Sequence, residues 1–177
     1  MNNYTLVNNE NPIEHWQYIN VDNKVVLDLG CGRWEKVENR DSNWLTTPEY
    51  FLANHALKVI AVDVDQEEIS WFRNKFPNHT NLEFILKSIN KKEDILDLYH
   101  TYKPNCVKFD IEGNEKLLLE LTREEFSNID EYYIETHGLD IYLKIIDILK
   151  LYEYTITNQI DLTHTRGYCK VIFAKKI

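Results

Sequence analysis

Cysteine is scarce in this sequence of 177 residues, and long apolar runs do not occur. The three cysteines, Cys31, Cys106 and Cys169, are far apart and show no metal-ligand spacing. An odd number of scattered thiols argues against a disulfide framework, so we expect reduced core residues in a cytoplasmic protein. No stretch approaches the ~20 apolar residues that span a bilayer. The start of the chain also lacks the basic and apolar regions of a signal peptide, and no membrane partner is expected.

Basic residues are also few relative to acidic ones. Lysine and arginine total 20 against 29 aspartates and glutamates, and the formal net charge is −9. Proteins that bind nucleic acid usually carry a basic face, so a nucleic acid partner is disfavoured. The length suits one domain, residues 1–177, with the Asn-rich segment 1–22 as a cover over the core. The oligomeric state is left open, with a homodimer as one option.

Short apolar runs alternate with amphipathic segments along most of the chain. Continuous apolar runs are typical of strands buried on both faces, and apolar residues every three or four positions indicate helices. Helices between successive strands predict a parallel sheet, whereas the last two strands have no helix between them and should pair antiparallel. The pattern predicts an α/β fold: a three-layer sandwich with a seven-stranded, mostly parallel, doubly wound sheet whose last strand is antiparallel. The predicted strands are 24–29, 58–63, 82–86, 106–110, 131–135, 154–160 and 168–174, and the predicted helices are 47–56, 66–76, 91–102, 114–121 and 139–151.

The first predicted strand runs directly into two glycines, in the stretch Asp28-Leu29-Gly30-Cys31-Gly32. Glycine at the carboxyl end of a strand lets a ligand approach the backbone where a Cβ would block it. A dinucleotide-binding fingerprint needs a third glycine at the start of the following helix. Here Arg33-Trp34-Glu35 and a long inserted loop over 33–47 follow instead. An NAD-dependent enzyme is therefore disfavoured.

The Asp-x-Gly-x-Gly pattern at the end of a first strand resembles motif I of the class I S-adenosylmethionine-dependent methyltransferases. The resemblance covers roughly residues 24–175 and departs from the family at Trp34, where a third glycine is common. It implies S-adenosylmethionine as the cofactor. In that family the acid, here Asp28, orients the glycine loop and contacts the methionine part of the cofactor.

Two later segments fit a nucleoside at the same edge of the sheet. Asp63 ends the second predicted strand, where a carboxylate can accept both ribose hydroxyls; a simple strand-end cap is the alternative. Asp65 is the rival ribose ligand. Ser88 and Ile89 follow the third strand and should pass near the adenine ring, where a plain turn is the alternative.

A second motif follows the fourth predicted strand. The stretch Lys108-Phe109-Asp110-Ile111-Glu112-Gly113-Asn114-Glu115 resembles the Lys-x-Asp-x-Glu-Gly-x-Glu signature of the FkbM family of methyltransferases. Ile134-Glu135-Thr136-His137 is similar to the acidic and histidine end of that family's fifth strand. The resemblance implies methylation of hydroxyl groups, commonly on sugars and natural products.

Methyl transfer to a hydroxyl needs an aligned acceptor and a base for its proton. His137 is the candidate base, since neighbouring carboxylates tune a histidine readily near neutral pH. Asp110, Glu112 and Glu135 either orient it or, with His137, hold Mg²⁺, which prefers oxygen ligands. A structural hydrogen bond at the strand end is the alternative for His137. We expect Glu115 to be a helix cap or a partner for Lys108 or Lys116.

These patterns together predict an S-adenosylmethionine-dependent methyltransferase acting on a hydroxyl of a small molecule or sugar. The predicted cofactor ligands are Asp28, Gly30, Gly32, Asp63, Ser88 and Asp110, and the predicted catalytic residues are His137, Asp110 and Glu112. Two alternatives stay open: a non-catalytic S-adenosylmethionine- or nucleotide-binding module that serves a partner protein, and a nucleic acid methyltransferase.

Overall fold

The computed structural model describes residues 19–32, 46–162 and 168–177. The expected cover segment over 1–22 and the inserted loop over 33–47 therefore lie almost entirely outside the described residues. Within the described ranges, no helix has both the length and the apolar character needed to cross a bilayer.

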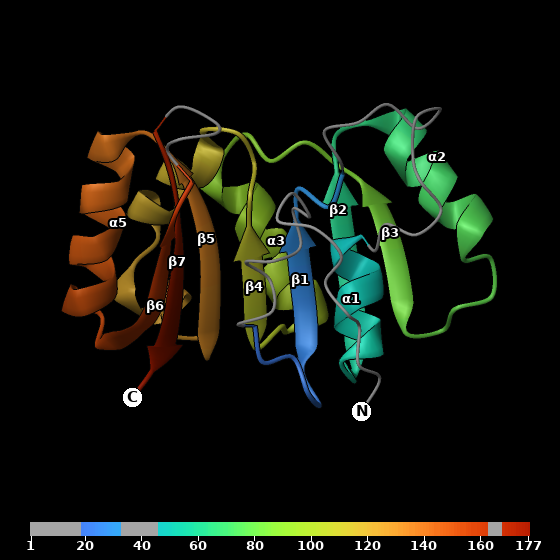
Figure 1. The fold of residues 1–177 in the computed structure, drawn as a ribbon, viewed down its shortest axis with the longest axis horizontal. Coiled ribbons are helices and arrows are strands. Elements are labelled where there is room, and N and C mark those ends of the chain that lie inside the picture. The colour runs from blue at the N-terminus through green and yellow to red at the C-terminus, as the bar shows by residue number, and fades with distance from the viewer. Residues whose placement is uncertain (1–18, 33–45, 163–167) are drawn as a thin grey trace.

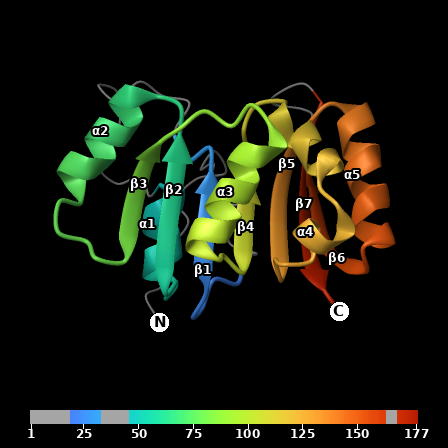
Figure 2. The ribbon, with the colours of Figure 1, turned by 180° about the vertical axis from the view of Figure 1, so that it is seen from behind.

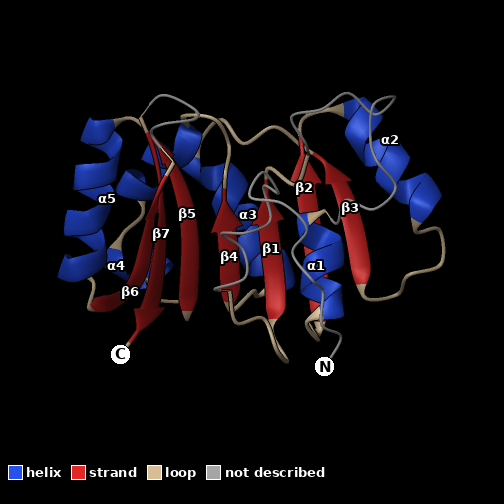
Figure 3. Ribbon diagram, viewed as in Figure 1, coloured by secondary structure: helices blue, strands red, loops and turns tan. Residues whose placement is uncertain are grey.

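A seven-stranded sheet forms the middle layer, with the spatial order β3-β2-β1-β4-β5-β7-β6 (Figures 1 and 3). Neighbouring strands are parallel except where β7 is involved, which runs antiparallel to both β5 and β6. The prediction of a mostly parallel sheet with an antiparallel last strand is confirmed. The last strand lies inside the sheet, between β5 and β6. The strands are β1 (Val25–Leu29), β2 (Lys58–Asp63), β3 (Leu82–Leu86), β4 (Cys106–Phe109), β5 (Glu131–His137), β6 (Tyr154–Asp161) and β7 (Cys169–Lys176).

Helices cover both faces of the sheet (Figures 1 and 2). One face carries α1 (Thr47–Ala53) and α2 (Gln66–Lys75); the other carries α3 (Lys92–Tyr102), α4 (Arg123–Phe126) and α5 (Leu139–Leu151). Successive residues of β1 supply both cores, because side chains alternate across a strand: Val26 packs on the α1–α2 side and Leu27 on the α3–α5 side. The predicted three-layer α/β sandwich is confirmed.

Three details differ from the expected elements. The segment Asn114–Glu120, expected as an α-helix, is a 3₁₀ helix that starts at Gly113, whose φ is 91°. The short helix α4 was not expected; Thr122 caps it together with Glu125. Helix α1 ends at Ala53, short of the expected residue 56, and Thr46 caps its start. Thr47 is thereby free to donate a hydrogen bond from Oγ1 to Asp28 Oδ2, at 2.5 Å.

Candidate cofactor and acceptor site

The two glycines after β1 lie in close contact with neighbouring segments, Gly30 with backbone and Gly32 with a carboxylate. Gly30 has a φ of +77°, and a Cβ added there would lie 1.7 Å from the carbonyl oxygen of Asp110. A Cβ on Gly32 would lie 2.6 Å from Asp63 Oδ2, which accepts a hydrogen bond from Gly32 N at 2.7 Å. The amides of Gly30 and Cys31 both donate to Val62 O. The loop is therefore held tightly against the ends of β2 and β4.

A buried ion pair supports this loop from below. Asp28 is fully buried, and its Oδ1 lies 2.9 Å from the equally buried Lys108 Nζ. Lys108 Nζ donates to Gly30 O at 2.7 Å. Burial lowers the pKa of Lys108, but the carboxylates of Asp28 and Asp110 outweigh it and hold that pKa above the ordinary lysine value. This geometry fits an orienting role for Asp28; its contact with a cofactor stays a prediction.

A cleft opens at the carboxyl ends of β1, β2 and β4. Ligands of open α/β sheets bind where the strand order reverses, and here that point lies between β1 and β4. The cleft has a volume of about 160 Å³, below the ~300 Å³ at which typical ligand pockets begin. Its lining residues are Gly30, Val62, Asp63, Val64, Lys87, Ser88, Ile89, Asp110, Ile111, Glu112 and Asn114.

The two rival ribose ligands have different positions. Asp63 lines the cleft, and its carboxylate accepts from Gly32 N and, at 2.9 Å, from Asp65 N. Asp65 caps α2 by accepting from Glu67 N and Glu68 N, and it does not line the cleft. Asp63 thus acts as a strand-end cap and also lines the cleft; its contact with a ribose stays a prediction. Each carboxylate oxygen can accept more than one hydrogen bond, so the two roles are compatible.

The second motif forms a turn that places Glu115 inside the protein. Glu115 is fully buried and accepts from Ile111 N at 3.1 Å and from Gly113 N at 3.0 Å. Its Oε1 lies 3.1 Å from His137 Nδ1. Of the two roles expected for Glu115, capping of the backbone is present, and its charged partner is His137 in place of a lysine.

Carboxylates surround His137 on several sides. Nε2 lies 3.5 Å from Glu112 Oε2 and 3.7 Å from Glu135 Oε1. The hydrogen bond with Glu115, opposed by burial, raises the pKa of His137 to about 9. Burial raises the pKa of Asp110 to about 7, against the attraction of Lys108. In this state His137 carries a proton near neutral pH, so acting as a base would first require that proton to leave.

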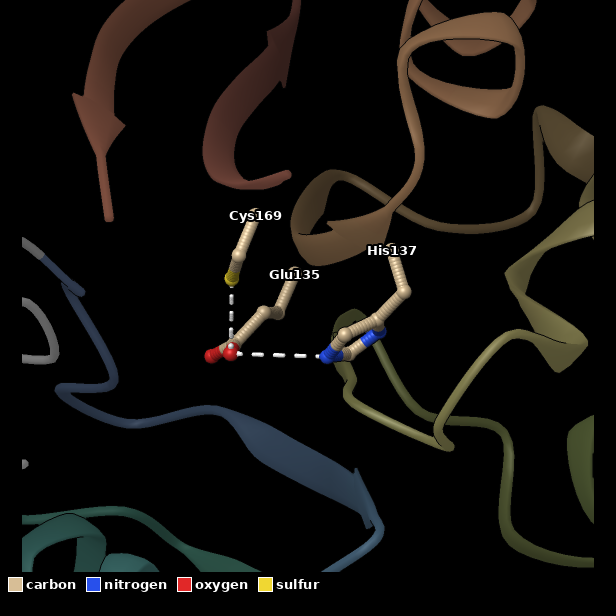
Figure 4. Close-up of side chains that lie close together, drawn as sticks. All are labelled: Glu135, His137 and Cys169. Atoms are coloured by element: carbon tan, nitrogen blue, oxygen red, sulfur yellow. Dashed lines mark hydrogen bonds and ion pairs between the residues drawn. The ribbon is translucent and has the colours of Figure 1, made fainter. Parts of the chain in front are cut away.

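Two neighbours of this cluster were not expected from the sequence. Cys169 donates a hydrogen bond from Sγ to Glu135 Oε1 at 3.1 Å (Figure 4). Asn114 donates from Nδ2 to Ile89 O at 3.1 Å, joining the second motif to the turn after β3. The only signal for Asn114 was its place within the motif, as a short polar side chain directly after Gly113. Nothing in the local sequence places Cys169 here, because its position depends on the register of β7 against β5.

No protein-family model and no curated protein matches this chain. Solved structures do resemble it. The chain is similar to a fibrillarin pre-rRNA processing protein of Methanococcus jannaschii, at 12% identity over 89% of this chain and 69% of that one, with a TM-score of 0.61. It is similar to the m1A22 tRNA methyltransferase of B. subtilis, at 16% identity over 91% and 63%, with a TM-score of 0.58. The magnesium protoporphyrin IX methyltransferase of Synechocystis, solved with bound S-adenosylhomocysteine, matches at 11% identity over 89% and 76%, with a TM-score of 0.57.

These similarities define the class of fold. The chain has the Rossmann-like fold of the class I S-adenosylmethionine-dependent methyltransferases, with a seven-stranded sheet flanked by helices. At identities of 11–16%, these similarities establish the fold but do not assign the chain to a family within it. The resemblance to the FkbM family therefore stays a prediction.

Proposed function

We propose that this protein is an S-adenosylmethionine-dependent methyltransferase that methylates a hydroxyl of a small molecule or sugar. The observation that carries the proposal is the cleft at the reversal point of the sheet. Its lining includes Asp63, Ser88 and Ile89, which suit a nucleoside, and the carboxylates of Asp110 and Glu112, which adjoin His137 outside the cleft.

The residues present fit the cofactor. The Gly30 backbone leaves no Cβ in the way, Asp63 offers a carboxylate to ribose hydroxyls, and Ile89 offers an apolar surface beside the hydroxyl of Ser88. When bound, S-adenosylmethionine supplies a methyl group activated by a sulfonium. The residues of this chain would bind the nucleoside, orient the acceptor and accept the proton of its hydroxyl.

Asp110, Glu112 and His137 would handle the acceptor. Asp110 lines the cleft and also lies in the cluster around His137, so it connects the two sides of the site. Its carboxylate and that of Glu112 would accept a hydrogen bond from an acceptor hydroxyl, and the cluster would take up the hydroxyl proton. A negatively charged cluster disfavours phosphate-rich acceptors and suits a neutral sugar or small molecule. The hydroxyl acceptor itself rests on the resemblance of the second motif.

Titration calorimetry with S-adenosylhomocysteine tests the cofactor side. The wild-type chain should bind one equivalent. Asp63→Ala should weaken binding about 10- to 100-fold, because a hydrogen bond to a charged group contributes ~1.5–3 kcal/mol. Asp65→Ala is the matched control and should bind like the wild type. Absence of binding, or equal binding by Asp63→Ala, would contradict the proposal.

A nucleic acid methyltransferase is the second candidate, because similar structures include an m1A22 tRNA methyltransferase. Its acceptor would be RNA, and binding would weaken steeply with added salt. A radiolabelled methyl-transfer assay separates the candidates when sugar, small-molecule and RNA acceptors are offered in parallel. Cofactor binding without transfer to any acceptor class would instead favour a binding module that serves a partner protein.

A further inference from the structure

Three potential metal ligands lie on one face of the sheet at the carboxyl end of β5. Glu135 and His137 are two residues apart on β5, so their side chains point to the same face. In the antiparallel pairing of β5 with β7, His137 lies directly opposite Cys169. Residues directly opposite each other have Cβ atoms ~4.5–5.5 Å apart. Strand geometry alone thus brings a carboxylate, an imidazole and a thiol together.

The distances between ligand atoms match a shared ion. Glu135 Oε1 lies 3.1 Å from Cys169 Sγ and 3.7 Å from His137 Nε2 (Figure 4). All three ligand atoms lie within 4.8 Å of one another. Bonds of ~2.0–2.3 Å from Zn²⁺ in a tetrahedral arrangement separate neighbouring ligands by roughly 3.3–3.8 Å. Small side-chain rotations would bring these atoms to that spacing.

The other nitrogen of His137 gives an independent indication. Histidines that bind metals almost always donate their second ring N–H to a carboxylate or carbonyl, which fixes the tautomer. Here Nδ1 lies 3.1 Å from Oε1 of the buried Glu115, which backbone amides hold in place. That contact orients the ring and directs Nε2 toward Glu135.

We propose that Glu135 Oε1, His137 Nε2 and Cys169 Sγ bind a divalent transition-metal ion such as Zn²⁺. Thiolate and imidazole ligands select this class of ion, whereas Mg²⁺ takes oxygen ligands almost exclusively. On binding, the Cys169 thiol and the protonated His137 Nε2 each lose a proton to solvent as the S–metal and N–metal bonds form, so one thiolate and one carboxylate balance the charge of the ion. The proposal replaces Mg²⁺, expected on Asp110, Glu112, Glu135 and His137, with a thiolate-containing site. It does not require binding of S-adenosylmethionine.

The exposed side of the cluster supplies an entry path and a fourth position. Cys169 and Glu135 are buried, whereas the Glu112 side chain is 69% exposed and reaches within 3.5 Å of His137 Nε2. Three protein ligands with an accessible fourth position are typical of catalytic zinc sites. Asp110 and Glu112 form a second group with His137 on this side. The fourth position therefore faces the proposed acceptor side of the cleft.

Metal titration of the chelator-treated full chain tests the proposal. Zn²⁺ should bind with one equivalent in calorimetry, and excess Mg²⁺ should not displace it. The Co²⁺-loaded protein should show a thiolate-to-cobalt charge-transfer band in the near ultraviolet. Cys169→Ser should lose this band, whereas Cys106→Ser, which changes another buried strand cysteine, should keep it.

Glu115→Gln measures the positioning effect of the buried carboxylate. It should weaken Zn²⁺ affinity about 10- to 100-fold while the cobalt band is retained. Cys169→Ser should weaken Zn²⁺ affinity more than Glu115→Gln does, because it removes a ligand. Absence of a stoichiometric site, absence of the cobalt band in the wild type, or a band that persists in Cys169→Ser would overturn the proposal. The cobalt spectrum of the wild type tests the metal site even if a variant fails to fold. A protein without the metal site should still bind S-adenosylhomocysteine, so the two proposals are tested separately.

Discussion

The two sides of the candidate site are stabilised in opposite ways. On the cofactor side, the buried Asp28–Lys108 pair and backbone hydrogen bonds from Gly30, Cys31 and Gly32 satisfy the loop after β1. On the proposed acceptor side, four carboxylates surround one histidine, and Lys108, which is paired with Asp28, lies 3.7 Å from one of them, Asp110. The first side is a pre-organised scaffold. The second keeps like charges close together, which costs stability unless a proton or cation balances them.

The largest effect is expected on the rate of methyl transfer, in a variant that should leave cofactor binding unchanged. His137→Ala should lower kcat for methyl transfer about 10²- to 10⁴-fold, the usual contribution of a positioned acid or base. Its affinity for S-adenosylhomocysteine should stay at the wild-type value, because His137 does not line the cleft. His100→Ala, which changes an exposed histidine on α3, is the control. Equal loss of affinity in His137→Ala would show that the two sides are not separate.

The second largest effect is expected from removal of the buried Lys108 ammonium, and it concerns the free energy of unfolding. Lys108→Met leaves the Asp28 carboxylate buried without its ionic partner, and such changes cost about 3–5 kcal/mol. Urea unfolding at neutral pH measures this loss. The double variant Asp28→Asn, Lys108→Met should recover much of it, because no uncompensated charge is left. A single-variant loss below about 1 kcal/mol, the value typical of surface pairs, would contradict a buried supporting role.

Two glycines with positive φ allow a matched test of the cofactor loop. Gly30→Ala places a Cβ against Asp110 O and forces a left-handed residue, and we expect a loss of about 3 kcal/mol. Gly113 has a φ of +91° with nothing within 4 Å of an added Cβ. Gly113→Ala should therefore lose only the left-handed strain, about 1–2 kcal/mol. Thermal unfolding compares the two, and equal losses would show that the approach of β4 does not constrain Gly30.

The smallest expected effect concerns Glu131, at the opposite end of β5 from the acid–histidine cluster. Burial raises the pKa of Glu131, but hydrogen bonds from Lys24 and Tyr133 outweigh it and lower that pKa below its usual range. The folded state therefore favours the charged form, and this stability is present above the unfolded pKa near 4.5. It should be lost as pH falls below that value. A modest drop in Tm between neutral pH and about pH 3 should be smaller in Glu131→Gln. An identical pH profile in both proteins would show that Glu131 contributes nothing.

Much of the fold could be predicted from the sequence, because apolar runs buried on both faces identify parallel strands. The site residues at strand ends followed from the same argument: Gly30, Asp63, Ser88, Asp110 and Glu112 do line one cleft. Their roles toward a cofactor or acceptor stay predictions.

Contacts that depend on tertiary placement could not be predicted. Lys108 is buried beneath the glycine loop, although a lysine in a strand normally indicates an exposed position. Cys169 reaches Glu135 only because β7 inserts between β5 and β6 in one particular register. Glu115 meets His137 because the segment after Gly113 is a 3₁₀ helix, whose side-chain directions differ from those of an α-helix.

A crystal structure of the full chain with S-adenosylhomocysteine tests the central claim most directly. The account predicts the ribose on Asp63, the adenine beside Ser88 and Ile89, and the sulfur directed toward Asp110 and the acid–histidine cluster. A cofactor bound away from the β1–β4 reversal point, or with its sulfur directed away from Asp110, would contradict it.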